Sequence, residues 1–130
     1  MNHRDLINLR LLIPLLGLIS SASHAQSFLC TPSEFRAEVT FGIGIFNLIV
    51  EPECLRLSSL TDKTRSWSWK ISVKNNLGDA EGSRNFCDGA DAGLIGNPAV
   101  WRMPTKQFIV FQTGGVAGPG ALFFNCSEAR

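Results

Sequence analysis

The most regular alternation of apolar and polar residues covers positions 66–74, where the sequence is SWSWKISVK. A period of two sustained over this length is typical of a half-buried β-strand, and aromatic and β-branched side chains suit a pleated sheet. Turn-forming residues follow at positions 75–79 and end the pattern. We therefore predict a strand over residues 66–74, with a buried face that consists of Trp67, Trp69, Ile71 and Val73.

The segment that begins at residue 31 supports two interpretations. Thr31-Pro32-Ser33-Glu34 resembles a helix capping box with proline at the first helical position, which predicts a helix from Pro32 to about Val39. From Phe35 onward, however, apolar residues alternate with polar residues or glycine, which predicts a strand. We favour the strand because the segment is rich in Phe, Val and Ile.

The apolar positions change parity after Ile45, and a one-residue shift exchanges the two faces of a strand. Gly42 and Gly44 are therefore expected to mark a bulge or a hairpin turn. Beyond this point a strand is expected whose buried side chains are Phe46, Leu48 and Val50.

Further short apolar stretches predict the remaining strands, at residues 55–57, 100–103, 107–112 and 121–126. Glycine-rich loops at 75–99 and 113–120 separate some of them. Short strands separated by turn residues are typical of antiparallel β-folds. The predicted fold is one mainly β domain, a small antiparallel sandwich or barrel.

The first 25 residues have the features of a cleaved secretory signal peptide. Arg4 and Arg10 precede a short apolar run, and Ser23-His24-Ala25 provides small residues before the expected cleavage point. The run is too short to span a bilayer. We expect residues 26–130 to form a single exported domain, periplasmic or secreted, with no transmembrane segment.

Four cysteines, Cys30, Cys54, Cys87 and Cys126, lie after this leader. An even number of cysteines behind an export signal predicts two disulfides, and no pair has the C-x-x-C spacing of a zinc or redox motif. Sequence alone leaves three connectivities open. We favour Cys30–Cys54 with Cys87–Cys126, because the first pair is placed symmetrically around a possible hairpin at Gly42.

Charge and composition exclude several classes of function. The chain carries 12 basic and 11 acidic residues, so it lacks the excess of Lys and Arg that nucleic-acid binding requires. Both histidines lie in the leader, and the chain contains no tyrosine. A Ser–His–Asp or Cys–His nucleophile cannot be built without histidine. We expect no metal, no cofactor and a function other than catalysis.

Aromatic residues are the first candidates for binding. Trp67 and Trp69 lie about 7 Å apart on one face of the predicted strand, a spacing that suits a sugar ring or an apolar partner surface. We favour the interpretation that both belong to the core, since Lys and Ser on the opposite face would meet water. Trp101 and Arg102 are further candidate anchors, since tryptophan and arginine dominate binding hot spots.

Carboxylates provide a second set of candidates. Asp79, Glu81, Asp88 and Asp91 would suit Ca²⁺, but they lack the regular ligand spacing of an EF-hand loop. We favour turn chemistry in a glycine-rich loop as their role. The same residues, or Glu51 and Glu53, are candidates for the acid and base pair of a glycan hydrolase.

These exclusions favour a small binding module that recognises a protein or a glycan through loops and apolar contacts. An inhibitor, an accessory subunit and a toxin-like delivery subunit all fit this description. The loops at 75–99 and 113–120 are the expected contact surfaces. The alternatives are a carboxylate-only glycan hydrolase and a structural subunit of an envelope assembly that associates through exposed edge strands.

Overall fold

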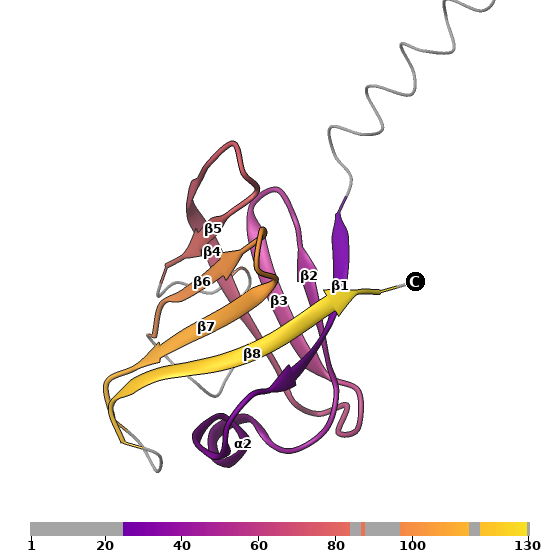
Figure 1. Ribbon diagram of the computed structural model, residues 1–130, viewed down its shortest axis with the longest axis vertical. Helices are drawn as coiled ribbons and strands as arrows, with labels where there is room; N and C mark the ends of the chain where they lie inside the picture. The colour runs from indigo at the N-terminus through magenta and orange to yellow at the C-terminus, as the bar shows by residue number, and fades with distance from the viewer. Residues whose placement is uncertain (1–24, 84–86, 88–96, 115–117, 130) are drawn as a thin grey trace, which may run out of the picture.

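The chain folds into a closed antiparallel β-barrel with a short helix at one end (Figure 1). The computed structural model describes residues 25–83, 87, 97–114 and 118–129. Within these ranges, each strand pairs with the next in sequence, and the last strand pairs with the first. The predicted antiparallel β-fold is confirmed in its barrel form.

The elements follow one another along the chain without crossovers. Their bounds are β1 (Gln26–Pro32), α2 (Phe35–Phe41), β2 (Phe46–Val50), β3 (Cys54–Ser59), β4 (Ser66–Lys74), β5 (Ala80–Gly82), β6 (Ala99–Arg102), β7 (Gln107–Gln112) and β8 (Gly120–Glu128).

The strand predicted from the alternating pattern is β4, with the expected bounds. Trp67 and Trp69 point into the barrel and are buried, as the period of two requires. The pattern is wrong at the end of the strand, because the pairing with β5 shifts between Ile71 and Val73. Val73 is consequently 52 % exposed.

The preferred strand beginning at Phe35 is wrong, because residues 35–41 form the helix α2. Its buried residues are Ala37 and Phe41, four positions apart and therefore on one helix face. Gly42 is the C-cap of this helix, with φ of +107°, and its N–H donates to the carbonyl of Glu38. Gly42 thus ends a helix, whereas the sequence predicted a bulge or hairpin at Gly42 and Gly44. The burial predicted for β2 is confirmed.

Two disulfides are present, but the preferred connectivity is wrong. The bonds join Cys30 to Cys126 and Cys54 to Cys87. Barrel closure explains the first, since β1 pairs with β8 and the register places Cys30 directly opposite Cys126. Because 96 positions separate these two cysteines, the bond removes about 5 kcal/mol of chain entropy from the unfolded state in the loop-closure model.

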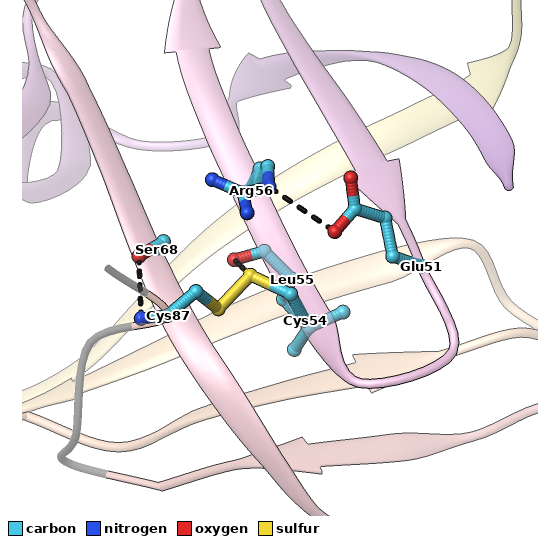
Figure 2. A network of polar contacts seen from close by, with 6 residues as sticks. All are labelled: Glu51, Cys54, Leu55, Arg56, Ser68 and Cys87. Atoms are coloured by element: carbon cyan, nitrogen blue, oxygen red, sulfur yellow. Dashed lines mark hydrogen bonds and ion pairs between the residues drawn. A yellow bond between two sulfur atoms is a disulfide. The ribbon is translucent and has the colours of Figure 1, made fainter.

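The second disulfide attaches the connection between β5 and β6 to the outer wall of the barrel (Figure 2). Cys54 begins β3 and pairs with Lys70 of β4, and Ser68 of β4 pairs with Arg56, two residues further along β3. The hydroxyl of Ser68 accepts the backbone N–H of Cys87 at 3.0 Å. Ser68 is buried although its side chain alternates with the inward-facing tryptophans. The bond and the hydrogen bond together hold Cys87 against β3 and β4.

Helix α2 covers one end of the barrel, at the bottom of Figure 1. The ring of Phe41 contacts the rings of Trp67 at 5.0 Å and Phe124 at 4.9 Å, both in edge-to-face geometry. Phe46 lies 5.4 Å from Phe124 in the same cluster. Edge-to-face pairs add about 0.5–1.5 kcal/mol each beyond the burial of their area. Aromatic packing therefore fixes the helix to the core.

The leader prediction concerns residues 1–25, nearly all outside the described residues, so it stays a prediction. Among the residues the structure describes, no helix is both long enough and apolar enough to cross a membrane.

Candidate functional site

All three tryptophans lie in the hydrophobic core, which is the interpretation favoured for Trp67 and Trp69. The indole Nε1–H of Trp69 donates to the carbonyl of Asn97 at 2.8 Å, which satisfies its polar atom inside the barrel. The ring of Trp67 contacts Phe41, and the guanidinium of Arg65 lies 5.4 Å from its centroid. Neither tryptophan offers an exposed face to a sugar or a protein.

The predicted pair Trp101 and Arg102 points to opposite sides of β6. Trp101 is fully buried and packs 4.6 Å from the ring of Phe28, whereas Arg102 is exposed. Within the described residues the indole nitrogen of Trp101 has no hydrogen-bond partner. Trp101 is therefore a core residue in this structure, and the role of Arg102 in binding stays a prediction.

The carboxylates predicted as an acid and base pair belong to a short turn. Glu51 and Glu53 lie in the connection between β2 and β3, at the end of the barrel opposite α2. The carboxylate of Glu51 accepts the Nε–H of Arg56 at 3.1 Å (Figure 2). This ion pair gives Glu51 a structural partner on the outer wall.

Asp79 has a similar structural role at the same end. One of its oxygens accepts the backbone N–H of Met103 at 2.9 Å, and the other accepts the Nδ2–H of Asn75 at 3.1 Å. The Asn75 side-chain oxygen accepts the N–H groups of Leu77 and Asp79. The turn from β4 to β5 is thereby joined to the turn from β6 to β7, and these polar groups bond to one another.

The calcium hypothesis receives no support from the described residues. Asp88 and Asp91 lie outside them. Among the residues that are described, no group of three or more His, Cys, Asp or Glu side chains is arranged to hold a metal ion.

The end of the barrel at α2 has a different surface, which the sequence analysis did not identify. Five exposed apolar side chains belong to the segments at this end, namely α2, the turn that follows it and the connection between β3 and β4. We call them the apolar rim: Phe35, Val39, Ile43, Ile45 and Leu60.

Helix geometry explains the first two members of the apolar rim. Successive residues of an α-helix are rotated by about 100°, so Phe35 and Val39 share the face opposite Ala37 and Phe41. The helix is apolar on both faces as a result. Phe35 is 74 % exposed, whereas Phe41 is fully buried. Packing in the core therefore does not explain why the outer face of the helix is apolar.

The third member of the apolar rim, Ile43, lies between two glycines. Gly42 and Gly44 both have positive φ, of +107° and +122°, which side chains rarely tolerate. A side chain at Gly44 would meet Thr61 at 3.1 Å. Between them, Ile43 is 76 % exposed, the most of any large apolar residue described.

The last two members of the apolar rim are neighbours across two strands. Phe46 pairs with Ser59, and the N–H of Leu60 donates to the carbonyl of Ile45 at 2.9 Å. The antiparallel pairing therefore continues by one residue beyond β2 and β3. Since Phe46 points into the barrel, Ile45 and Leu60 point outward side by side.

Polar contacts hold the backbone under the apolar rim. The guanidinium of Arg65 donates to the carbonyl of Thr40 at 3.1 Å. In the turn that follows Leu60, Asp62 accepts the hydroxyl of Thr64 at 2.6 Å and its N–H at 3.1 Å. These bonds to the charged form lower the pKa of Asp62, the hydroxyl more than the N–H.

One of the two predicted contact loops reaches the same end. The guanidinium of Arg36 donates to the carbonyls of Gly118 and Pro119, at 3.1 and 2.6 Å. Residues 115–117 of that loop, and most of the 75–99 loop beyond Ser83, lie outside the described residues. Their roles in binding stay predictions.

Comparisons with known proteins do not add a relative. No protein-family model matches the chain, and neither a curated protein nor a solved structure matches it.

Proposed function

We propose that this chain is a small exported binding module that docks a protein partner through the apolar rim. The observation that carries the proposal is the concentration of five exposed large apolar side chains at the α2 end. Contiguous exposed apolar surface on a soluble domain is typical of an interaction site.

A protein suits this surface better than a glycan does. Sugar recognition commonly uses an exposed aromatic platform, and the tryptophans that would supply one are buried. The apolar rim consists mostly of branched aliphatic side chains, which pack against the apolar side chains of another protein. An inhibitor or an accessory subunit acts through such contacts and needs no reacting group.

The proposed compartment is supported by the two disulfides, because such bonds persist in oxidising environments outside the cytoplasm. It is also supported by the sequence of residues 1–25, which has the features of a cleaved export signal.

The test compares two matched substitutions at opposite ends of the barrel. Ile43→Asp places a charge in the apolar rim, and Leu77→Asp places the same charge on a residue that is 67 % exposed in the turn from β4 to β5. Each purified protein, with its disulfides intact, is immobilised and exposed to envelope extract of the host cell. Captured proteins are identified by mass spectrometry, and circular dichroism checks the fold.

We expect at least one protein to be captured by the wild type and by Leu77→Asp but not by Ile43→Asp. A charge in an apolar contact leaves a desolvated, unpaired group and costs the complex most of its affinity. Capture that survives Ile43→Asp and is lost with Leu77→Asp would transfer the binding function to the opposite end. Equal capture by all three proteins would refute the apolar rim as the docking face.

A further inference from the structure

The barrel begins at the residue that export would leave at the amino terminus. Strand β1 starts at Gln26, which pairs with Val50 of β2, whereas Ala25 is exposed and belongs to no strand. The leader sequence ends in Ser23-His24-Ala25, which predicts cleavage of the bond between Ala25 and Gln26. Two independent observations, the leader motif and the start of the first strand, therefore point to the same bond.

Gln26 lies in solvent at this point of the fold. Ala25, Gln26 and Ser27 are all exposed, and the first buried side chain of β1 is that of Phe28. Within the ranges that the structure describes, the side-chain amide of Gln26 makes no hydrogen bond. The fold therefore neither buries this amide nor holds it away from the backbone nitrogen of the same residue.

An exposed glutamine with a free α-amine can cyclise. The amine nitrogen attacks the side-chain carbonyl carbon, the bond from this carbon to the amide nitrogen breaks, and ammonia leaves with one proton taken from the amine. The product is the five-membered lactam pyroglutamate, and no oxidant or other co-reactant is consumed. Near neutral pH a fraction of α-amines is uncharged and therefore nucleophilic. Because both reacting groups belong to one residue, the step has the high effective concentration of an intramolecular reaction.

The barrel accommodates the product. The lactam keeps one N–H and the backbone carbonyl of residue 26, so the pairing of this residue with Val50 is retained. The ring replaces a side chain that lies in solvent, and no buried residue has to move. Cyclisation removes the positive charge that cleavage creates. This charge would otherwise lie in the shallow cleft that Gln26 lines together with Glu51 and Lys74.

We propose that the exported chain carries pyroglutamate at position 26, formed by attack of the released α-amine on the side-chain amide of Gln26. The modification gives the domain a neutral, blocked amino terminus at the end of the barrel opposite α2. This inference rests on the proposed export, because cleavage after Ala25 is the step that releases the amine. It does not depend on docking at the apolar rim.

The test examines the amino terminus of the wild-type protein as it is isolated from the cell envelope. Free amines are dimethylated at the moment of extraction, so that cyclisation during later handling is not counted. After digestion, the peptide that begins at residue 26 is identified by mass spectrometry. We expect most of this peptide to be unlabelled at its α-nitrogen and lighter than the unmodified peptide by about 17 Da, the mass of the lost ammonia.

The matched control is Gln26→Asn, which keeps a side-chain amide but would have to close a strained four-membered ring. Position 26 is exposed, so we expect this variant to be cleaved and folded as the wild type is. Its terminal peptide should carry the dimethyl label on the α-nitrogen. A terminus that stays unlabelled in Gln26→Asn would mean that a different group blocks it, and would overturn the assignment of pyroglutamate.

The remaining outcomes separate this inference from the proposed function. A wild-type peptide that begins at residue 26 with a labelled α-nitrogen would overturn the inference and leave the export intact. A chain cleaved at another bond would also overturn it, because residue 26 would then not supply the free amine. A chain that retains residues 1–25 would refute the export together with the inference. Docking at the apolar rim is decided separately, by the capture experiment with Ile43→Asp.

Discussion

At the α2 end, aromatic packing holds the polypeptide in place and leaves apolar side chains in solvent, whereas at the opposite end hydrogen bonds hold the turns and satisfy their own polar groups. Phe41 fixes α2 to the core, and Asp79 joins two turns at the other end. The polar end still has exposed apolar residues in Val73 and Leu77. What distinguishes the α2 end is that five of them belong to its segments.

This difference separates structural from functional explanations. The hydrogen-bonding groups of Asp79 and Asn75 find their partners within the barrel, so the stability of the fold is enough to explain these residues. The stability of the fold does not explain Phe35 or Ile43, because both side chains remain exposed and therefore add little buried apolar area to the core. Residues that the fold leaves unexplained are the ones to test for binding.

The largest expected effect on stability comes from a substitution on the buried face of α2. Phe41→Ala removes the ring that contacts Trp67 and Phe124 and should lower the free energy of unfolding by about 3–5 kcal/mol. The matched control is Phe35→Ala on the outer face of the same helix, where a change within about 0.5 kcal/mol is expected. Urea unfolding with intact disulfides measures both.

Equal losses in the two phenylalanine variants would contradict the orientation of α2. A large loss in Phe35→Ala alone would mean that the outer face is covered by the protein itself. In that case the apolar rim would be part of the core and could not serve as a docking face.

An intermediate effect is expected at the polar end. Asp79→Ala leaves the N–H of Met103 and the amide of Asn75 without their acceptor, which should cost about 1–3 kcal/mol in the same assay. Glu81→Ala, two residues away on the exposed side of β5, is the control and should change stability by less than about 0.5 kcal/mol. If Asp79→Ala is as silent as Glu81→Ala, hydrogen bonds do not hold that end.

The sequence predicted the strands whose burial follows a single rule. In β2 and in most of β4, one face is buried, so period-two alternation identifies the element and the inward residues. The exceptions have local causes. Ser68 is covered on the outer wall by Cys87, and a register shift turns Val73 outward. Neither the attachment of a distant segment nor a bulge is visible in an alternation pattern.

The apolar rim itself explains why α2 was mistaken for a strand. Ala37 and Phe41 are apolar because they are buried, and Phe35 and Val39 are apolar although they are exposed. Together they produce every second residue apolar, as in a strand. A helix with one polar face would have shown the period of 3.6. The capping box at Thr31–Glu34 did not locate the helix either, because Thr31 and Pro32 belong to β1 and Glu34 is the N-cap without a side-chain cap hydrogen bond.

The disulfide connectivity could be predicted only with knowledge of the order in which the strands pair. The preferred pairing assumed a hairpin centred on Gly42, and that glycine instead ends α2. Only the closure of β8 on β1 brings Cys30 opposite Cys126. Such a pairing over nearly the whole domain leaves no trace in local sequence.

The smallest expected effect concerns the turn that carries Leu60 and Lys63 at the α2 end. The hydroxyl and the N–H of Thr64 hold the pKa of Asp62 below its usual value of 3.8. Because the folded-state pKa is the lower one, the stabilisation is fully present above pH 3.8 and is lost as the pH falls through the folded-state value. Asp62 is exposed, so the signature is expected in its own titration rather than in global unfolding.

A titration of the Asp62 carboxyl carbon by NMR measures this directly. Thr64→Val removes the hydroxyl donor and keeps the backbone N–H, so the midpoint should rise towards the usual value without reaching it. The control, Thr105→Val in the connection between β6 and β7 at the polar end, should leave the midpoint unchanged. An unchanged midpoint in Thr64→Val would show that the Thr64 hydroxyl does not order this turn.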